Sequence, residues 1–331
     1  MSLESVETPP PASLSGAPET DPELTSPLAR FAGHPPAAPS WFNEALANRP
    51  ERRFIDVGGV DIETLAWGAV GRPGLMLLHG NRAHADWWSF IAPFFAHTHR
   101  VAAISWSGMG GSGWRERYSL SDHVDEILVC AEALGLFAAP QKPVLVGHSF
   151  GSSPLTRAAG VAGERLRLAV TVDSGVGVGA EPGATQPKGT SRPNRVYPTL
   201  EAALQRFRLS PLQPCENPFL VHHIARGALR PAPLPEGGEG WTWAFDPFAN
   251  DSRGDAHRGA QDVAIRAMRC PLVVMWGAQS ALVTPEVVAR TRAAAPPGTP
   301  FIEIPNAYHH VMLDQPLAFV AALRAVLETA A

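Results

Sequence analysis

The sequence predicts an α/β fold in which a mostly parallel β-sheet is flanked by helices. First, short apolar stretches alternate with helical patterns from Arg52 onward, which is typical of a sheet covered on both faces. Second, an apolar strand pattern at 143–147 runs through Gly147-His-Ser-Phe-Gly151 into a helical segment at 152–160. Third, the alternation stops between 175 and 260 and then resumes, which indicates a long insertion within one core.

The composition of the chain is typical of a globular protein that binds neither nucleic acid nor membranes. The chain has 331 residues, of which 45% are hydrophobic, enough for a sizeable core. Its net charge is −4 with both signs interspersed, so we expect neither nucleic acid nor a membrane surface as a partner. Three widely spaced cysteines without C-x-x-C spacing favour free thiols over disulfides or zinc ligands. Without a leader-like or spanning apolar segment, we expect a soluble cytoplasmic protein, either monomer or homodimer.

Residues 1–38 are rich in proline and acidic residues and contain one aromatic residue, Phe31. Such a segment buries too little apolar surface to fold alone, so it is predicted to be a flexible tail. The next segment, 40–46, has the pattern of a short helix. We expect Trp41, Phe42 and Leu46 to pack this helix on the domain.

The predicted core comprises residues 39–174 and 261–331. Its strands are short apolar runs bounded by turn residues, and its helices show apolar residues at a period of 3.6. The strands are expected at 53–57, 61–67, 75–78, 101–105, 143–147, 166–173, 272–276 and 301–304. The helices are expected at 86–95, 121–136 with Ser121 as its cap, 152–160, 286–295 and from 314 to the end.

Residues 175–260 are predicted to form a cap or lid inserted between two strands of the core. Prolines, glycines and aromatic residues accumulate there, and helical patterns occur at 200–208 and 218–228. An insertion of this length within a compact domain usually serves an active site.

Ser149 is the candidate nucleophile. A chain that turns from strand to helix within a few residues needs tiny residues two before and two after the serine, as Gly147 and Gly151 are. This nucleophile elbow displays the hydroxyl above the edge of the sheet. It also directs the Phe150 backbone N–H, at the start of a helix, toward a developing oxyanion.

A serine needs a base oriented by a third group, which directs the search to a late histidine. His309 follows the last predicted strand in Ala307-Tyr-His-His-Val-Met-Leu-Asp314-Gln-Pro, with His310 as its rival. With the elbow, this stretch resembles the α/β-hydrolase superfamily, whose last loop reads small-x-Gly-His and then acid-Gln-Pro. Counting back from Asp314 selects His309, and Tyr308 replaces the usual glycine.

The stretch Leu77-Leu-His79-Gly80-Asn81 resembles the His-Gly oxyanion segment of the same superfamily. The resemblance implies that the backbone N–H of Asn81 is the second oxyanion donor beside that of Phe150. His79 is expected to hold the loop, and Arg82 is a candidate substrate contact. Gly108-Met-Gly-Gly-Ser-Gly113 matches G-x-G-x-x-G, but the helix and the acidic residue of a dinucleotide site do not follow, and we expect no cofactor.

The orienting acid departs from the usual pattern of the superfamily. Most members carry it in a Gly-x-x-Asp phrase after the seventh strand, where this chain has Ser280. Some branches place it after the strand that follows the elbow helix, which here ends at Asp173. We therefore expect Asp173 to orient His309, with Asp246 and Asp251 as weaker candidates.

Aromatic residues gather in the loops and in the insertion, which predicts a mainly apolar pocket. The candidate substrate contacts among them are Trp106, Trp241 and Trp243. The adjacent pair His222 and His223 lacks the i, i+4 spacing of a metal site on a helix, and we expect no metal.

The predicted activity is hydrolysis of an uncharged, fairly apolar carboxylic ester or lactone through an acyl-enzyme. Serine rather than aspartate at the elbow argues against dehalogenase or epoxide hydrolase chemistry. Two alternatives remain. The same residues could cleave a C–C bond or transfer the acyl group to another acceptor, and Ser280 in the usual acid position motivates a non-catalytic binding protein.

Overall fold

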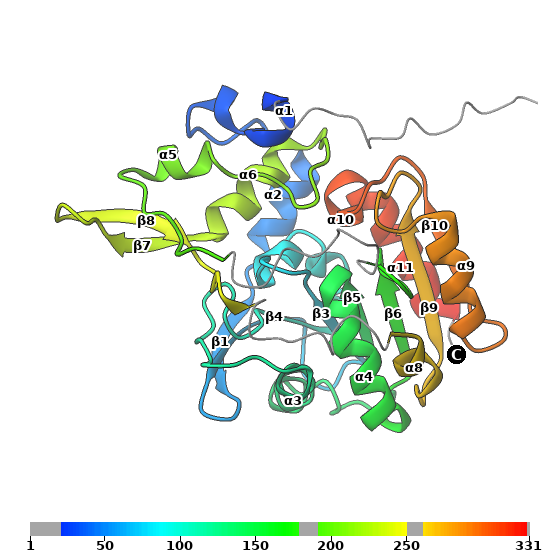
Figure 1. The fold of residues 1–331 in the computed structure, drawn as a ribbon. Helices are drawn as coiled ribbons and strands as arrows, with labels where there is room; N and C mark the ends of the chain where they lie inside the picture. Colours follow the sequence, from blue (N-terminus) through cyan, green and yellow to red (C-terminus); the bar gives the residue numbers. More distant parts are fainter. Residues whose placement is uncertain (1–20, 179–190, 250–260, 330–331) are drawn as a thin grey trace, which may run out of the picture.

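The computed structural model describes residues 21–178, 191–249 and 261–329. Its centre is an eight-stranded sheet with the order β1-β2-β4-β3-β5-β6-β9-β10 (Figure 1). β2 runs antiparallel to β1 and β4, and the other neighbours are parallel. The strands are β1 Glu51–Asp56, β2 Asp61–Trp67, β3 Gly74–Leu78, β4 Arg100–Ile104, β5 Val144–His148, β6 Leu168–Val172, β9 Leu272–Gly277 and β10 Phe301–Ile304. The predicted mostly parallel sheet is confirmed.

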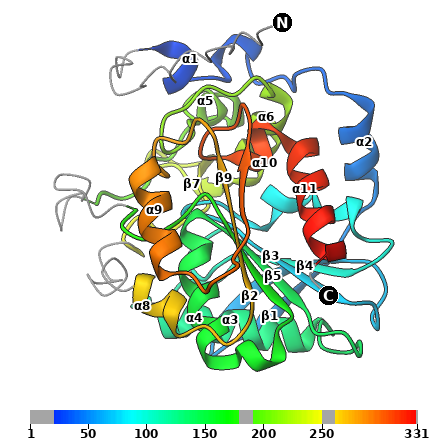
Figure 2. The same cartoon turned by 90° about the vertical axis from the view of Figure 1, so that its right-hand side faces the viewer.

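The sheet is buried on both faces because its central strands are apolar at every position. In β3, Leu75 and Leu77 belong to one core cluster, whereas Met76 and Leu78 belong to the other. The period-2 alternation of a strand therefore fills two separate cores. The strands run between α3 (Leu120–Ala133) and α4 (Ser152–Ala162) on one side and α2 (Ser40–Ala47) and α11 (Pro316–Thr329) on the other (Figure 2).

The helices predicted at 121–136 and 86–95 differ most from the structure. The N-cap of α3 is Ser119, two residues before the expected Ser121, and it forms a capping box with Asp122. Residues 86–95 do not form one α-helix but two 3₁₀ turns, η2 (Ala85–Trp88) and η3 (Ala92–Phe94). Pro93 lacks the N–H that a continuous helix needs, which explains the break. The remaining core helices are η5 (Gly163–Arg165), α8 (Gln261–Arg266), α9 (Pro285–Ala294) and α10 (Val311–Asp314).

The insertion between β6 and α8 is described at 175–178 and 191–249; residues 179–190 and 250–260 of the predicted cap lie outside the described ranges. It contains α5 (Leu200–Leu204), α6 (Pro218–Gly227) and a hairpin of β7 (Leu229–Pro233) and β8 (Glu239–Trp243). Figure 1 shows α5 and α6 above the sheet and the hairpin extending to one side. His84 of the core donates from Nε2 to the Ile224 carbonyl of α6 over 2.8 Å, and this hydrogen bond connects the core to the insertion.

The end of the predicted tail is ordered against the rest of the protein. Residues 21–38 contain α1 (Pro22–Thr25) and η1 (Ala29–Phe31), and Leu28 is 2% exposed within the main core cluster. The sequence predicted a flexible tail here because a segment rich in proline has no local pattern that identifies Leu28 and Phe31 as core contacts. Residues 1–20 lie outside the described ranges. Within the described part of the chain, no helix combines the length and apolar character needed to cross a membrane.

Candidate active site

Ser149 stands on a strained turn between β5 and α4. Its φ angle is +51°, in the left-handed region that side chains other than glycine rarely adopt. The two flanking glycines make this turn possible. A Cβ at Gly147 would lie 2.7 Å from the Gly151 carbonyl oxygen, and one at Gly151 would lie 2.7 Å from the His79 carbonyl oxygen. The predicted nucleophile elbow is therefore present in η4 (Ser149–Gly151), with Ser149 partly exposed.

Strand register places two of the other candidate residues on either side of Ser149. Leu78 of β3 pairs with Gly147 of β5, so Gly80 comes level with Ser149 two residues later. A Cβ built at Gly80 would stand 3.3 Å from Ser149 Cβ, which shows how closely this loop approaches the serine. On the other side His148 pairs with Val172 of β6, and Asp173 therefore lies next to Ser149 at the carboxyl edge of the sheet.

His309 reaches the same edge from the loop after β10. This loop passes directly over Gly277 at the end of β9, where a Cβ would lie 2.3 Å from the carbonyl oxygens of Ala307 and Tyr308. Only glycine allows so close a crossing. His309 is 3% exposed, and its Nδ1 lies 2.6 Å from Asp173 Oδ2. Because a carboxylate oxygen can only accept, Nδ1 carries the proton and the lone pair of the neutral ring is on Nε2.

Asp173 is fully buried and held from three directions. Its Oδ1 accepts the Gly277 backbone N–H at 3.0 Å, and its Oδ2 accepts the Ser280 hydroxyl at 2.7 Å in addition to His309. Ser280, which occupies the usual acid position of the superfamily, therefore holds the Asp173 carboxylate in place. The Ser280 Oγ also accepts the N–H groups of Leu282 and Val283, which fixes its own position.

Ser149 and His309 are not joined by a hydrogen bond in this structure. Among the described residues, the Ser149 hydroxyl makes no hydrogen bond with the His309 ring, although Asp173 already fixes that ring. Catalytic hydrogen bonds are often long in free enzymes and tighten when the substrate binds.

The loop around Asn81 is shaped from beneath by His79 and Trp106. His79 Nδ1 lies 2.7 Å from the Gly80 carbonyl, and its Nε2 accepts the Trp106 backbone N–H at 3.1 Å. The Trp106 indole N–H donates to the His79 carbonyl at 2.9 Å. The holding role expected for His79 is thus visible in its contacts. Phe150 follows Ser149 directly, and its ring packs edge-on against Trp106.

Trp106 corrects one expectation. The sequence placed this residue among the substrate contacts, but it is 0% exposed and packs within the core beneath the Phe150 ring. Its indole N–H is already engaged by the His79 carbonyl. Trp106 therefore supports the loop around Asn81 from inside the core and does not face a ligand. An aromatic residue directly after a strand has the same local sequence pattern whether it packs in the core or faces a ligand. The sequence alone therefore could not distinguish these two roles.

The other predicted substrate contacts, Arg82, Trp241 and Trp243, pack against residues of the insertion. Arg82 is exposed, and its guanidinium lies 5.1 Å from the centre of the Phe245 ring of the insertion. Trp243 packs beside Tyr197 and Phe207, and Trp241 lies under Arg226. These partners of Trp241 and Trp243 all belong to the insertion. The structure thus gives both tryptophans a packing role on the β7–β8 hairpin.

Asp246 and Asp251 were weaker candidates for the acid. Asp246 accepts the Tyr118 hydroxyl at 2.8 Å and the Phe248 N–H at 2.9 Å, so it is engaged away from His309. Asp251 lies outside the described residues.

The insertion contributes a clasp around His309 that the sequence did not reveal. Asp314 accepts the Tyr308 N–H at 2.8 Å, and Gln213 of the insertion accepts the His310 N–H at 3.1 Å. The Gln213 amide also donates to Asp314 at 3.0 Å, so the two side chains hold the backbone on both sides of His309. Burial raises the pKa of the Asp314 carboxyl to about 7. No local pattern marks Gln213, because its role depends on a partner about a hundred positions away.

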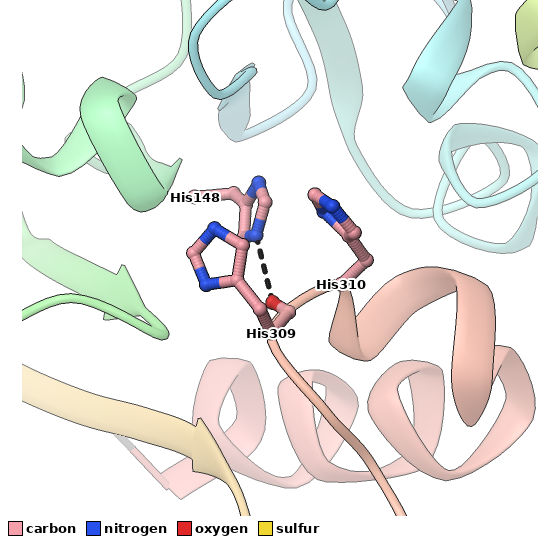
Figure 3. Close-up of side chains that lie close together, drawn as sticks. All are labelled: His148, His309 and His310. Carbon is pink, nitrogen blue, oxygen red and sulfur yellow. Dashed lines mark hydrogen bonds between the residues drawn. The ribbon is translucent and has the colours of Figure 1, made fainter. Parts of the chain in front are cut away.

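The described residues contain one group of three potential metal-ligating side chains, and it lies at this site: His148, His309 and His310 (Figure 3). His148 Nε2 lies 2.9 Å from the His309 carbonyl oxygen, and because a carbonyl only accepts, Nε2 is the donor.

Comparisons with known proteins agree with the predicted fold. The alpha/beta hydrolase family model matches residues 75–323. Esterase Rv0045c of Mycobacterium tuberculosis is 27% identical over 289 residues, which cover 85% of this chain and 90% of that protein. Pimeloyl-(acyl-carrier protein) methyl ester esterase of Edwardsiella ictaluri is 23% identical over 256 residues, which cover 76% of this chain and 92% of that protein.

A crystal structure of Esterase Rv0045c shares the fold, with a TM-score of 0.65 and 22% identity over 95% of this chain and 100% of that one. Both curated relatives are named as esterases, in line with the predicted enzyme class of carboxylic ester hydrolase. The predicted fold is confirmed. The family model covers most of the sheet, the elbow and the His309 loop, and the chain belongs to the alpha/beta hydrolase family.

Proposed function

We propose that the protein is a serine hydrolase that cleaves an uncharged, fairly apolar carboxylic ester or lactone through an acyl-enzyme. The observation that carries the proposal is the buried 2.6 Å contact between His309 Nδ1 and Asp173 Oδ2, beside a serine in a strained elbow. An alcohol, an imidazole and a carboxylate in this order form the relay that activates a serine for acyl transfer.

In the proposed mechanism Ser149 Oγ attacks the carbonyl carbon of the substrate while His309 Nε2 takes the serine proton. Asp173 keeps the proton of His309 on Nδ1 and stabilises the imidazolium that forms. The backbone N–H groups of Asn81 and Phe150 are the proposed donors to the oxyanion. His309 then protonates the leaving alcohol, and a water molecule, activated by the same ring, hydrolyses the acyl-enzyme and restores Ser149.

The surroundings of the proposed relay support an uncharged substrate. Burial and the neighbouring His309 lower the pKa of His148 and His310 well below 6.5, so both rings are neutral at neutral pH. The Trp87 ring lies beside His310, with 5.2 Å between ring centres. A site lined by neutral imidazoles and aromatic rings favours an apolar acyl group over a charged one.

A panel of p-nitrophenyl esters of increasing acyl length, together with simple lactones, tests the proposal. Wild-type protein should release p-nitrophenol and a free carboxylic acid, and Ser149→Ala should lose this activity by several orders of magnitude. Ser121→Ala, an exposed serine on α3, is the matched control. Transfer of the acyl group to an added alcohol, in place of carboxylic acid release, would indicate an acyltransferase. Absence of turnover on every ester and lactone would contradict the proposal.

A further inference from the structure

Three buried imidazoles converge at the carboxyl edge of the sheet, at the end of β5 and in the loop before α10 (Figure 3). The centres of the His148 and His309 rings are 4.9 Å apart, and those of His309 and His310 are 4.8 Å apart. The exposed fractions of the three residues are 2%, 3% and 5% in chain order. One ring nitrogen from each residue lies within 4.8 Å of the other two.

His310 is the member of this cluster that the proposed mechanism does not use. Neither of its ring nitrogens has a hydrogen-bond partner among the described residues. The Ser210 carbonyl lies nearby, outside hydrogen-bond geometry. A buried polar ring without a partner costs free energy, and in native proteins such a group usually has a functional explanation. The unpartnered nitrogens of His310 therefore point to a ligand.

The ring nitrogens suit a cation better than an anion, because a neutral imidazole has one nitrogen with a lone pair and three such rings converge here. Both ring nitrogens of His310 are without a hydrogen-bond partner among the described residues, so its lone pair is available to a ligand. His309 offers Nε2, since its Nδ1 proton faces Asp173. His148 donates from Nε2 to the His309 carbonyl, so it binds a cation either through Nδ1 or by giving up that hydrogen bond.

We propose that His148, His309 and His310 form an inhibitory binding site for a borderline transition-metal dication, represented by Zn²⁺. Three imidazoles are a common ligand set for this class of ion, whereas Mg²⁺ and Ca²⁺ prefer oxygen ligands. Zn–N bonds of about 2.0–2.1 Å require ligand nitrogens roughly 3.4 Å apart, so nitrogens that are up to 4.8 Å apart must approach by as much as about 1.4 Å. Most of this movement is assigned to side-chain rotation of His310, whose ring nitrogens have no hydrogen bond to break, because Asp173 holds the His309 ring.

A bound ion would inhibit the proposed hydrolysis because it occupies the lone pair on His309 Nε2. A cation on His309 Nε2 removes the atom that would accept the Ser149 proton, while Asp173 remains bound on Nδ1 and strengthens the ligand, as carboxylate partners of metal-bound histidines do. This inhibitory effect rests on the proposed function. The binding of the ion does not, and it can be measured without any substrate.

The first experiment measures Zn²⁺ binding to the full-length protein by isothermal titration calorimetry at pH 7.5. His310→Phe removes both ring nitrogens, and because these have no partner the apolar ring should be tolerated; His310→Leu is the second variant, and thermal melts verify folding of both. His97→Phe, at an exposed histidine, is the matched control. We expect one tight site in the wild type and in His97→Phe, and at least about tenfold weaker binding in both His310 variants. Equal affinity in a folded His310 variant would overturn the proposal.

The second experiment measures ester hydrolysis against Zn²⁺ concentration, each protein normalised to its own metal-free rate. Zn²⁺ should inhibit the wild type and EDTA should restore it, Mg²⁺ should have no effect, and the half-inhibitory concentration should rise at least about tenfold in His310→Phe. If zinc binds through His310 but no ester is turned over, the proposed function fails and the metal site stands. If hydrolysis proceeds and zinc inhibits wild type and His310→Phe alike, the metal site fails and the proposed function stands.

Discussion

The loop that carries His309 is held from two sides, and the two sides hold different parts of it. The sheet side holds the ring, through the fully buried Asp173, which is itself fixed by Gly277 and Ser280. The insertion side holds the backbone, through Gln213 and its partner Asp314. This difference shows that the two sets of contacts have different roles. Contacts from the sheet determine the proton position on His309, whereas contacts from the insertion determine where the loop lies.

The largest expected effect comes from the sheet side. Asp173→Asn keeps the shape of the residue but replaces the acceptor of the His309 proton, so the ring can adopt the wrong tautomer. We expect kcat for ester hydrolysis to fall by about 10⁴-fold with the fold intact. Asp125→Asn, at an exposed position on α3, provides the control. A loss of less than tenfold in Asp173→Asn would assign the acid to another residue.

Ser280→Ala should have the next largest effect. It removes a hydroxyl that donates to the carboxylate over 2.7 Å but leaves the Gly277 N–H and His309 in place. Hydrogen bonds to charged groups contribute about 1.5–3 kcal/mol, so we expect kcat to fall by about ten- to a hundredfold. Steady-state kinetics of Ser280→Ala beside Ser280→Thr, which restores the hydroxyl, measures this. Equal losses in both variants would mean that the hydroxyl itself does not support Asp173.

Gln213→Met tests the insertion side. This change keeps the length of the side chain but removes both contacts of Gln213, so the His310 N–H loses its acceptor and Asp314 keeps only the Tyr308 N–H of the clasp as a donor. A looser loop should lower kcat by about tenfold, because small displacements of catalytic groups slow the reaction even when the contact between Asp173 and His309 is kept. Gln205→Met, also in the insertion, is the control, and the pH profile of kcat/KM is the second readout. A shifted profile would show that Gln213 acts on the chemistry of His309 and not on its placement.

Asp314→Asn should have the smallest effect on turnover, because the amide oxygen still accepts the Tyr308 N–H. Its effect is on stability. The folded pKa of Asp314 is about 7, raised by burial from 3.8, so the folded state binds this proton more tightly than the unfolded chain. The stabilisation is fully present below about pH 4 and is lost as the pH rises to about 7, by about 4 kcal/mol at most.

Thermal melts of the wild type and Asp314→Asn at pH 5 and pH 8 measure this linkage. The Tm of the wild type relative to the variant should be lower at pH 8 than at pH 5. The same difference in Tm at both values would contradict the raised pKa of Asp314.

The same two sides explain what could be predicted from the sequence. Strands such as 61–67 and 301–304 were located to the residue, because apolar runs bounded by turn residues identify buried strands without tertiary information. The geometry also brings Ser149, Asp173 and His309 to one edge of the sheet, since parallel register fixes where strand ends meet. Ser280 was noted only as a missing acid, and its hydrogen bond to Asp173 needed coordinates.

The insertion was less predictable because its side chains find their partners by packing. Trp241 and Trp243 are aromatic residues of the kind that line pockets, but they pack against other residues of the insertion. Gln213 has no sequence pattern that identifies it as a partner of Asp314. Likewise, no sequence spacing predicts that His148 lies beside His309 and His310, because they are about 160 positions apart in the chain.

The most direct test of the account is labelling with a fluorophosphonate probe, followed by mass spectrometry of the intact protein and its peptides. The wild type should gain one adduct on Ser149, Ser149→Ala should gain none, and His309→Ala should react at least about a hundredfold more slowly, because the base that activates the serine is gone. An adduct on Ser149→Ala, or an unlabelled wild type, would contradict the claim that Ser149, His309 and Asp173 act as one relay.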